Sequence, residues 1–260
     1  MPLVVLIGLG LDSEKGITVQ GLEEARLSNK LFAEFYTNPM PNLNMQELQK
    51  MVGRKITVLT RTQLEDENAE EILRSAENGR VALLVPGDPM IATTHVSLRL
   101  ALAKRNIPSR IVHGTSVVSA ICGATGLQSF KFGKSVTLPG AGETVPTSVL
   151  ETLRENLARR LHTLLLLDIA PDKATGLTIN EGLNKLTSTD SSLKSSLVVG
   201  AARVGSPDER VRAGKAENLQ SFDFGEPPHS LVFPGRLHFM EKEALRLLDG
   251  ATDSDLEDNE

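Results

Sequence analysis

The 260-residue chain has no tryptophan, one tyrosine and one cysteine, and aromatic residues make up 3% of it. The single cysteine, Cys122, excludes an internal disulfide framework and a cysteine-based zinc cluster. So few aromatic rings argue against the base-stacking surfaces that bind single-stranded nucleic acid. No apolar run approaches the roughly 18–20 residues that a membrane-spanning helix needs.

The residues that are abundant indicate a folded chain. Hydrophobic residues make up 40% and charged residues 23%, which is enough for a sizeable core. The formal net charge of −5 argues against non-specific binding to a nucleic-acid backbone. The apolar N-terminus, MPLVVLIGLG, lacks the basic region and the cleavage site of a signal peptide and is expected to form a strand. We therefore expect a cytoplasmic globular protein that acts on a small molecule or on another protein.

Short apolar runs alternate with amphipathic segments over the first half of the chain. Strands are expected at residues 3–7, 30–36, 81–85 and 109–112, and helices at residues 19–27, 65–77, 94–105 and 116–126. Strands that are apolar throughout and alternate with helices are typical of a mainly parallel sheet covered on both faces.

The composition changes at residues 131–146, where glycine and proline cluster, and this predicts a connector. Beyond it, helices are expected at residues 149–160, 178–186 and 238–248, and strands at residues 163–167, 197–204, 211–213 and 230–233. We therefore predict two α/β domains, with a mainly parallel N-terminal sheet and a mixed C-terminal sheet. The predicted bounds are 1–130 for the first domain, 131–146 for the connector, 147–250 for the second domain and 251–260 for a disordered acidic tail.

Three loops are candidates for a binding site because each follows a predicted strand. They are residues 8–10 (GLG), 86–89 (PGDP) and 114–116 (GTS). Ligands of an open parallel sheet bind at the carboxyl ends of its strands, and glycine lets a ligand approach the backbone closely. The alternative is that these are ordinary strand-to-helix turns.

The first loop also resembles a dinucleotide fingerprint, since GLGLDS nearly matches G-x-G-x-x-G. Ser13 replaces the third glycine, and the next helix is predicted to begin only near Thr18, too far away to receive a pyrophosphate. Glu34 could still take the role of the ribose-binding acid. A nicotinamide-dependent oxidoreductase therefore stays open as an alternative.

Asp88 is the most informative single residue, because Pro86 and Pro89 fix the backbone around it. Its carboxylate could accept a hydrogen bond from a ribose hydroxyl or an amine, or it could cap the helix after Thr93. His113 and His229 could each act as a base, although the pattern favours a core or capping role for each. No histidine pair has metal-ligand spacing, so no metal is expected, and the residues identify no catalytic group. Cys122 is expected to be buried filler.

Several segments together resemble the diphthine synthases. These segments are LIGLGL (6–11), VPGDPMIATTH (85–95), FKFG (130–133), HTLLLLDI (162–169), ARVG (202–205) and GEPPHSL (225–231). They follow one another in the family's order over nearly the whole chain. The chain lacks the insertion that eukaryotic members carry after FKFG, so it is more similar to the archaeal form.

The resemblance implies a member of the tetrapyrrole-methylase-like, class III methyltransferases. It implies two α/β domains, a homodimer, and S-adenosylmethionine bound in the cleft between the domains. It also implies successive N-methylation of the aminocarboxypropyl group on a modified histidine of translation elongation factor 2, which gives the trimethylammonium of diphthine. No membrane and no direct nucleic-acid partner is expected.

The family's cofactor-binding positions carry over by motif. In this sequence they are Leu9, Asp88, Ile91, Ser116, Val117, Leu167, Val204 and His229. The sequence departs from the family pattern at Gly114–Thr115 and at Pro228, beside two of these positions. Three other functions stay open: a methyltransferase of the same fold acting on a tetrapyrrole or ribosomal RNA, the nicotinamide-dependent oxidoreductase, and a non-enzymatic binder of the elongation factor.

Overall fold

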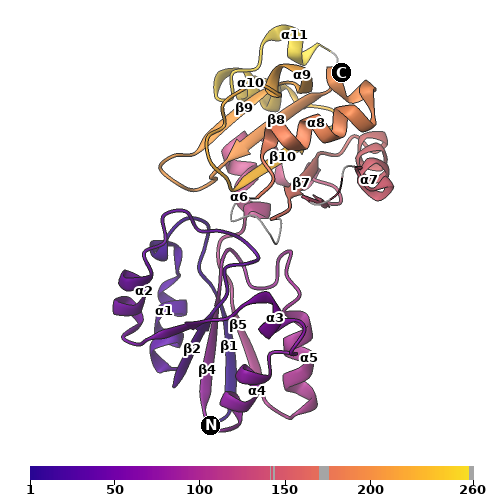
Figure 1. Cartoon of the computed structure of the whole chain (residues 1–260). Coiled ribbons are helices and arrows are strands. Elements are labelled where there is room, and N and C mark those ends of the chain that lie inside the picture. Colours follow the sequence, from indigo (N-terminus) through magenta and orange to yellow (C-terminus); the bar gives the residue numbers. More distant parts are fainter. Residues whose placement is uncertain (141, 143, 170–175, 258–260) are drawn as a thin grey trace. The chain divides into compact units, whose positions relative to one another are not determined.

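The computed structural model describes residues 1–140, 142, 144–169 and 176–257 of the chain. The chain divides into two compact units, Met1–Val117 and Val118–Glu260 (Figure 1). None of the helices in these described ranges combines the length and the apolar composition needed to cross a membrane.

The first unit is built on a five-stranded parallel sheet, as predicted. Its strands are β1 (Leu3–Gly8), β2 (Lys30–Ala33), β3 (Ile56–Val58), β4 (Arg80–Val85) and β5 (Ser109–Val112), in the spatial order β3-β2-β4-β1-β5. The central strands β1 and β4 are continuous apolar runs because helices cover both of their faces.

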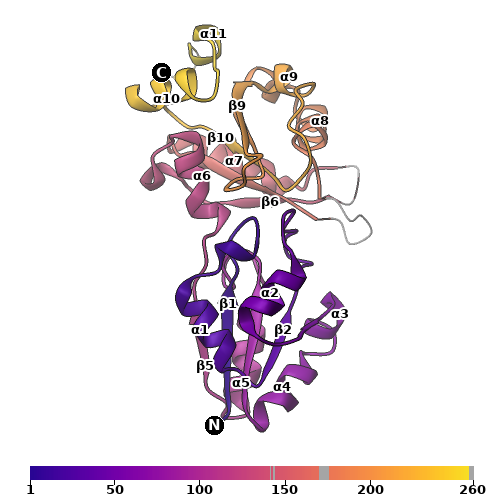
Figure 2. The same ribbon diagram turned by 90° about the vertical axis from the view of Figure 1, so that its left-hand side faces the viewer.

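Helices lie on both faces of this sheet, as Figure 2 shows. The helices of the first unit are α1 (Val19–Leu27), α2 (Met45–Val52), α3 (Arg61–Leu64), α4 (Glu70–Glu77) and α5 (Val96–Lys104), with a 3-10 turn at Glu14–Gly16. One core packs α1 and α2 against the sheet and the other packs α3, α4 and α5 against the opposite face. The alternation of side chains along β1 explains this split, since Val4 and Leu6 enter one core and Val5 and Ile7 the other.

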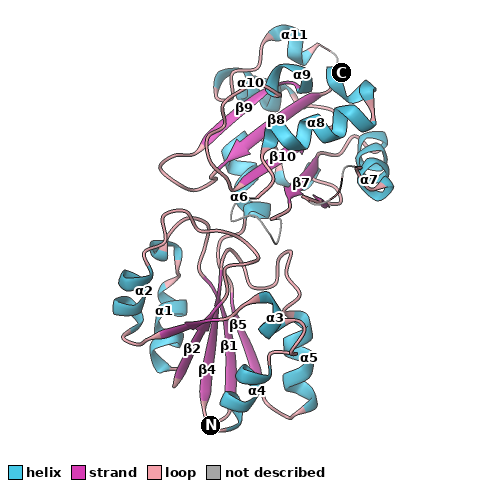
Figure 3. Cartoon of the chain, in the orientation of Figure 1, coloured by secondary structure: helices cyan, strands magenta, loops and turns pink. Residues whose placement is uncertain are grey.

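The second unit has a mixed five-stranded sheet, also as predicted (Figure 3). Its strands are β6 (Val136–Leu138), β7 (Thr163–Leu167), β8 (Leu197–Ala202), β9 (Arg210–Lys215) and β10 (His229–Phe233), in the order β6-β7-β10-β8-β9. Only β6 and β7 are parallel among the described pairs, and β10 runs antiparallel to both β7 and β8. The carboxyl ends of β7 and β8 therefore lie beside the start of β10.

The helices of the second unit are α6 (Val117–Thr125), α7 (Thr147–Ala158), α8 (Ile179–Thr189), α9 (Ala216–Leu219), α10 (Phe239–Leu247) and α11 (Asp253–Leu256), with 3-10 turns at Ser129–Lys131 and Ser191–Ser195. Helix α6 begins at Val117, the last residue of the first unit. The main apolar core packs α7, α8 and α9 against one face of the sheet. Leu164 of β7 points to the other face, where it lines a cavity together with Val118 and Cys122 of α6.

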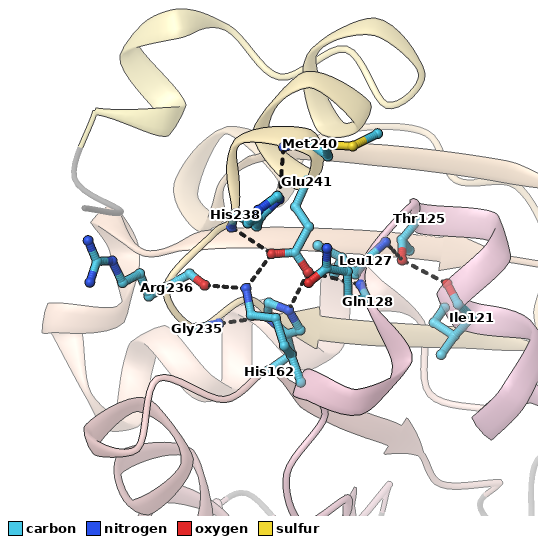
Figure 4. Close-up of polar contacts among 11 residues, drawn as sticks. Ile121, Thr125, Leu127, Gln128, His162, Gly235, Arg236, His238, Met240 and Glu241 are labelled. Carbon is cyan, nitrogen blue, oxygen red and sulfur yellow. Dashed lines mark hydrogen bonds and ion pairs between the residues drawn. The ribbon is translucent and has the colours of Figure 1, made fainter.

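A fully buried carboxylate ties together the segments that follow α6 and precede α10 (Figure 4). Glu241 accepts hydrogen bonds from the Gln128 and His238 backbone amides, at 2.9 and 2.7 Å. It also accepts from Nε2 of buried His162, at 2.9 Å, and from Nζ of Lys131. Burial raises the pKa of Glu241, but these donors outweigh burial and hold the pKa below its usual value.

The structure differs from the predicted bounds in three places. The units separate at Val117/Val118 rather than at residue 130, because the segment after α6 is held to the second unit through Lys131 and Glu241. Residues 131–146 are not only a connector, since they contain β6, which pairs with β7.

The predicted disordered tail also contains structure. Residues 253–256 form α11, whose N-cap Thr252 accepts from the Asp255 amide, and Leu256 is buried. Residues 258–260 of that predicted tail lie outside the described residues.

Candidate functional site

Three loops meet at the carboxyl edge of the parallel sheet in the first unit, and glycine makes this possible. A Cβ atom on Gly8 would lie 2.5 Å from the Gly114 nitrogen and 2.5 Å from the Gly87 carbonyl oxygen. Any side chain at Gly8 would therefore separate the loops. Gly87 has a φ of 67°, a conformation that favours glycine.

The first loop is fixed to the second by backbone hydrogen bonds. The Gly87 amide donates to the Gly10 carbonyl at 2.7 Å, and the Gly10 amide donates back at 3.2 Å. The Leu9 amide donates to the Val85 carbonyl at 2.8 Å, and its side chain is buried. Leu9, a predicted site residue, therefore stands directly beside the loop that carries Asp88.

Asp88 follows β4, and its two carboxylate oxygens have different partners. Oδ1 accepts from the Met90 amide at 2.9 Å, which fixes the turn after Asp88. Oδ2 lies 2.7 Å from Nδ1 of His113, the residue that follows β5. The alternative role of Asp88 as the cap of the next helix is not found, because α5 has His95 at its N-cap position.

The other predicted residues of the first unit lie close to these loops. The Ile91 amide donates to the Asp88 carbonyl at 3.2 Å, and the Ile91 side chain is 41% exposed. Ser116 is buried and immediately precedes Val117, the first residue of α6. The structure thus brings Leu9, Asp88, Ile91 and Ser116 to one edge of the sheet.

Glu34 and His95 form a buried pair behind the Asp88 loop. Glu34 accepts from the hydroxyl and the amide of Thr37 and is fully buried, so it is not an exposed ribose-binding acid. Burial raises the pKa of Glu34 and lowers the pKa of His95. His95 Nδ1 lies 3.0 Å from the Pro89 carbonyl, so it supports the backbone next to Asp88.

The three predicted residues of the second unit also share one edge of their sheet. Leu167 ends β7 and His229 begins β10, which runs antiparallel to β7. Val204 follows β8, and the amide of the preceding Arg203 donates to the carbonyl of Pro228 at 2.8 Å. All three predicted side chains are buried.

One ring nitrogen of His229 has no hydrogen-bond partner among the residues that the structure describes. Its Nδ1 accepts from the Ile179 amide at 3.1 Å, so Nε2 carries the hydrogen in the neutral ring. Nε2 is buried with no described group within hydrogen-bond distance, and burial lowers the pKa of His229 to about 4. An orphaned donor of this kind suits an acceptor atom on a ligand.

Two further expectations can be compared with the structure. Cys122 is half-buried rather than buried, and it lines a cavity of about 420 Å³ together with Phe132 and Leu164. In the part of the chain that the structure describes, no group of three or more His, Cys, Asp or Glu side chains is arranged to hold a metal ion.

Comparison with known proteins shows what kind of protein carries these loops. The profile of the tetrapyrrole (corrin/porphyrin) methylases matches residues 3–220. A diphthine synthase from Methanocella arvoryzae is 41% identical over 254 residues, which is 95% of this chain and 98% of that protein. The chain belongs to the diphthine synthases of the tetrapyrrole methylase family. It is therefore a methyltransferase, and the oxidoreductase alternative is disfavoured.

Other diphthine synthases agree with this placement. One from Methanosarcina barkeri is 39% identical over 259 residues, covering 95% of this chain and 96% of that protein. A crystal structure of a diphthine synthase has a TM-score of 0.90 and 37% identity, and the match covers 99% of this chain and 100% of that chain.

The pairing of His113 with Asp88 was not predicted from the sequence. The two residues are 25 positions apart and follow the strands that flank β1 on either side. Gly8 at the end of β1 lets the two loops meet above it. The sequence did hold a sign that these loops meet, since Gly8, Gly87 and Gly114 each follow a predicted strand.

Proposed function

We propose that this protein transfers methyl groups from S-adenosylmethionine to the aminocarboxypropyl-histidine of translation elongation factor 2, giving the trimethylammonium of diphthine. The observation that carries the proposal is the similarity to proteins named diphthine synthase, at 41% identity over 95% of the chain. We further propose that the protein works as a homodimer in the cytoplasm.

The residues present fit S-adenosylmethionine. We propose that Leu9, Asp88, Ile91, Ser116 and Val117 of the first unit hold it, together with Leu167, Val204 and His229 of the second. When bound, it supplies a methyl group already activated on a sulfonium. The buried carboxylate of Asp88 suits a cationic ligand, and the unpartnered Nε2 of His229 suits a ligand acceptor atom.

The main task of the chain in such a reaction is alignment. Placing an amine in line with a reactive carbon is worth up to roughly 7–11 kcal/mol in well-oriented intramolecular reactions. The loops at residues 8–10, 86–89 and 114–116 suit this task because backbone contacts hold them in place. Their glycines also leave carbonyl oxygens accessible at short range.

Intact-mass spectrometry tests the proposal. Archaeal elongation factor 2 carrying the aminocarboxypropyl-histidine would be incubated with the protein and S-adenosylmethionine. We expect stepwise gains of one, two and three methyl masses at that histidine. An unchanged mass, with cofactor binding confirmed by calorimetry, would contradict the proposal and direct the search to tetrapyrrole or RNA acceptors. Tight cofactor binding with no product on any acceptor would instead indicate a non-enzymatic binder.

A further inference from the structure

We propose that His113 is the general base of this reaction and that Asp88 orients its ring, an inference that rests on the proposed function. In this arrangement Nε2 of His113 takes the proton from the acceptor amine, while Nδ1 is held by the carboxylate of Asp88. His113 therefore has a catalytic role distinct from that of the residues expected to hold the cofactor.

The geometry fixes which ring nitrogen is available. Nδ1 of His113 lies 2.7 Å from Oδ2 of Asp88, and a carboxylate can only accept. Nδ1 therefore carries the hydrogen in the neutral ring, and the lone pair is on Nε2. Asp88 cannot turn away easily, because the Met90 amide holds its other oxygen and its side chain is only 8% exposed.

Exposure separates His113 from three of the four other histidines. Its side chain is 71% exposed, so Nε2 can meet a substrate and return a proton to solvent. His95, His162 and His229 are buried. His238 caps α10 through its Nδ1, which accepts from the Met240 amide. Within the described part of the chain, His113 alone combines a carboxylate partner with an exposed second nitrogen.

Methylation of an amine requires a proton acceptor at each round. An amine is largely protonated at neutral pH and then has no lone pair, so one proton must leave before each transfer. The nitrogen lone pair then forms the new N–C bond, while the electron pair of the broken C–S bond stays on sulfur. The product nitrogen is again cationic and must lose a further proton before the next round. One proton thus leaves for each methyl group added.

An imidazole paired with a carboxylate suits this proton transfer. A neutral imidazole is the side chain most often used as a general base, and general bases contribute about 10²–10⁴-fold. The Asp88 carboxylate stabilises the imidazolium that forms, and water then takes the proton from the exposed ring. Among the described residues, Asp88 is the charged group that faces His113 within ion-pair distance.

A rival interpretation makes His113 only a support for Asp88. The variants His113→Asn and His113→Ala distinguish the two roles. The Asn amide can donate to Asp88 from the position of Nδ1, but it offers no base. The Ala variant removes both the donor and the base. Three measurements apply to each variant and to the wild type: calorimetric affinity for S-adenosylhomocysteine, the single-turnover rate at saturating S-adenosylmethionine, and the pH profile of that rate.

We expect His113→Asn to bind S-adenosylhomocysteine within about twofold of the wild type and to react about 10²-fold more slowly. Its rate should no longer rise through the pH range in which histidine titrates, and added imidazole should partly restore His113→Ala. A wild-type rate and pH profile in His113→Asn would overturn the inference. So would weakened binding in His113→Ala, rescued by Asn, with the rate at saturation unchanged.

A measurement independent of activity checks the geometry. In ¹H–¹⁵N spectra that resolve imidazole tautomers, we expect His113 in the Nδ1–H form, and we expect Asp88→Asn to shift this balance. An Nε2–H form in the wild type would overturn the inference. If the wild type binds the cofactor but never methylates the elongation factor, the proposed function fails. If the wild type and His113→Asn are equally active, only the role of His113 fails.

Discussion

Two hydrogen-bonded histidine–carboxylate pairs, His113–Asp88 in the first unit and His162–Glu241 in the second, have nearly the same hydrogen-bond length and very different surroundings. His113 lies 2.7 Å from Asp88, and His162 lies 2.9 Å from Glu241. The His113 side chain is 71% exposed, whereas His162 is fully buried. The first pair stands at the edge of a parallel sheet, and the second lies inside the second unit.

The difference between the pairs lies in the nitrogen that does not face the carboxylate. His162 uses both nitrogens, since Nδ1 accepts from the Gly235 amide at 3.0 Å and Nε2 donates to Glu241. Because Nδ1 accepts a hydrogen bond, the ring is neutral and serves to hold the chain in place, and burial lowers the pKa of His162. A histidine–carboxylate pair is therefore a candidate for catalysis only where the second nitrogen is free to meet a substrate.

Removal of the buried carboxylate should have the largest effect. Glu241→Ala leaves fully buried His162 without its acceptor and takes the carboxylate from half-buried Lys131, and loss of one partner of a buried ion pair costs about 3–5 kcal/mol. We expect urea denaturation to show a loss of unfolding free energy of this size. The matched control is Glu47→Ala, which breaks an exposed pair with Lys50 and should cost less than about 1 kcal/mol. Equal losses in the two variants would contradict the structural role of Glu241.

A histidine with no carboxylate partner should show its effect in acid. Burial lowers the pKa of His229 to about 4, against about 6.5 in an unfolded chain. The folded state then binds fewer protons, so its stabilisation is present above pH 6.5 and is lost as the pH falls toward 4. The total loss from His229 is roughly 3 kcal/mol.

Urea denaturation at pH 7 and pH 4.5 measures this loss. His229→Gln should lose less stability than the wild type over that range. The pKa values of His95 and His162 are also lowered by burial, so the difference between variant and wild type isolates His229. Identical pH slopes would show that His229 does not titrate in this window.

The smallest change in free energy is expected at Asp88, and it should appear as weaker cofactor binding. Asp88→Ala should weaken calorimetric affinity for S-adenosylmethionine tenfold or more, about 1.4 kcal/mol, because a charge-assisted contact is lost. Asp253→Ala, which breaks an exposed pair with Arg246, is the control and should leave affinity unchanged. Unchanged affinity in Asp88→Ala would remove Asp88 from the binding site.

Most of the fold could be predicted because its central strands β1, β4 and β7 are mainly apolar runs. The predicted strands at residues 109–112 and 163–167 match β5 and β7. The short strands β3 and β6 were missed, since each has three residues and contributes little apolar sequence. The predicted helix at residues 65–77 is broken, because Asn68 and Ala69 adopt positive φ angles before α4 begins.

The candidate site could be predicted only in part. The three loops follow from strand ends and glycine positions, which the sequence displays directly. Asp88 meets His113 because β4 and β5 flank β1, and the order of strands in a sheet cannot be inferred from the local sequence pattern. The role of Leu256 was missed for a similar reason, because one buried leucine in an acidic segment gives no periodic signal.

The backbone contact of Gly8 with Gly87 and Gly114 has a consequence for the thermodynamics of recognition. Fixing one residue of a loose loop costs about 1–2 kcal/mol of conformational entropy. Here that cost is met when the chain folds, since the three loops already hold one another in place. A ligand that binds at this edge, as proposed above, would use its contacts for affinity rather than for ordering these loops.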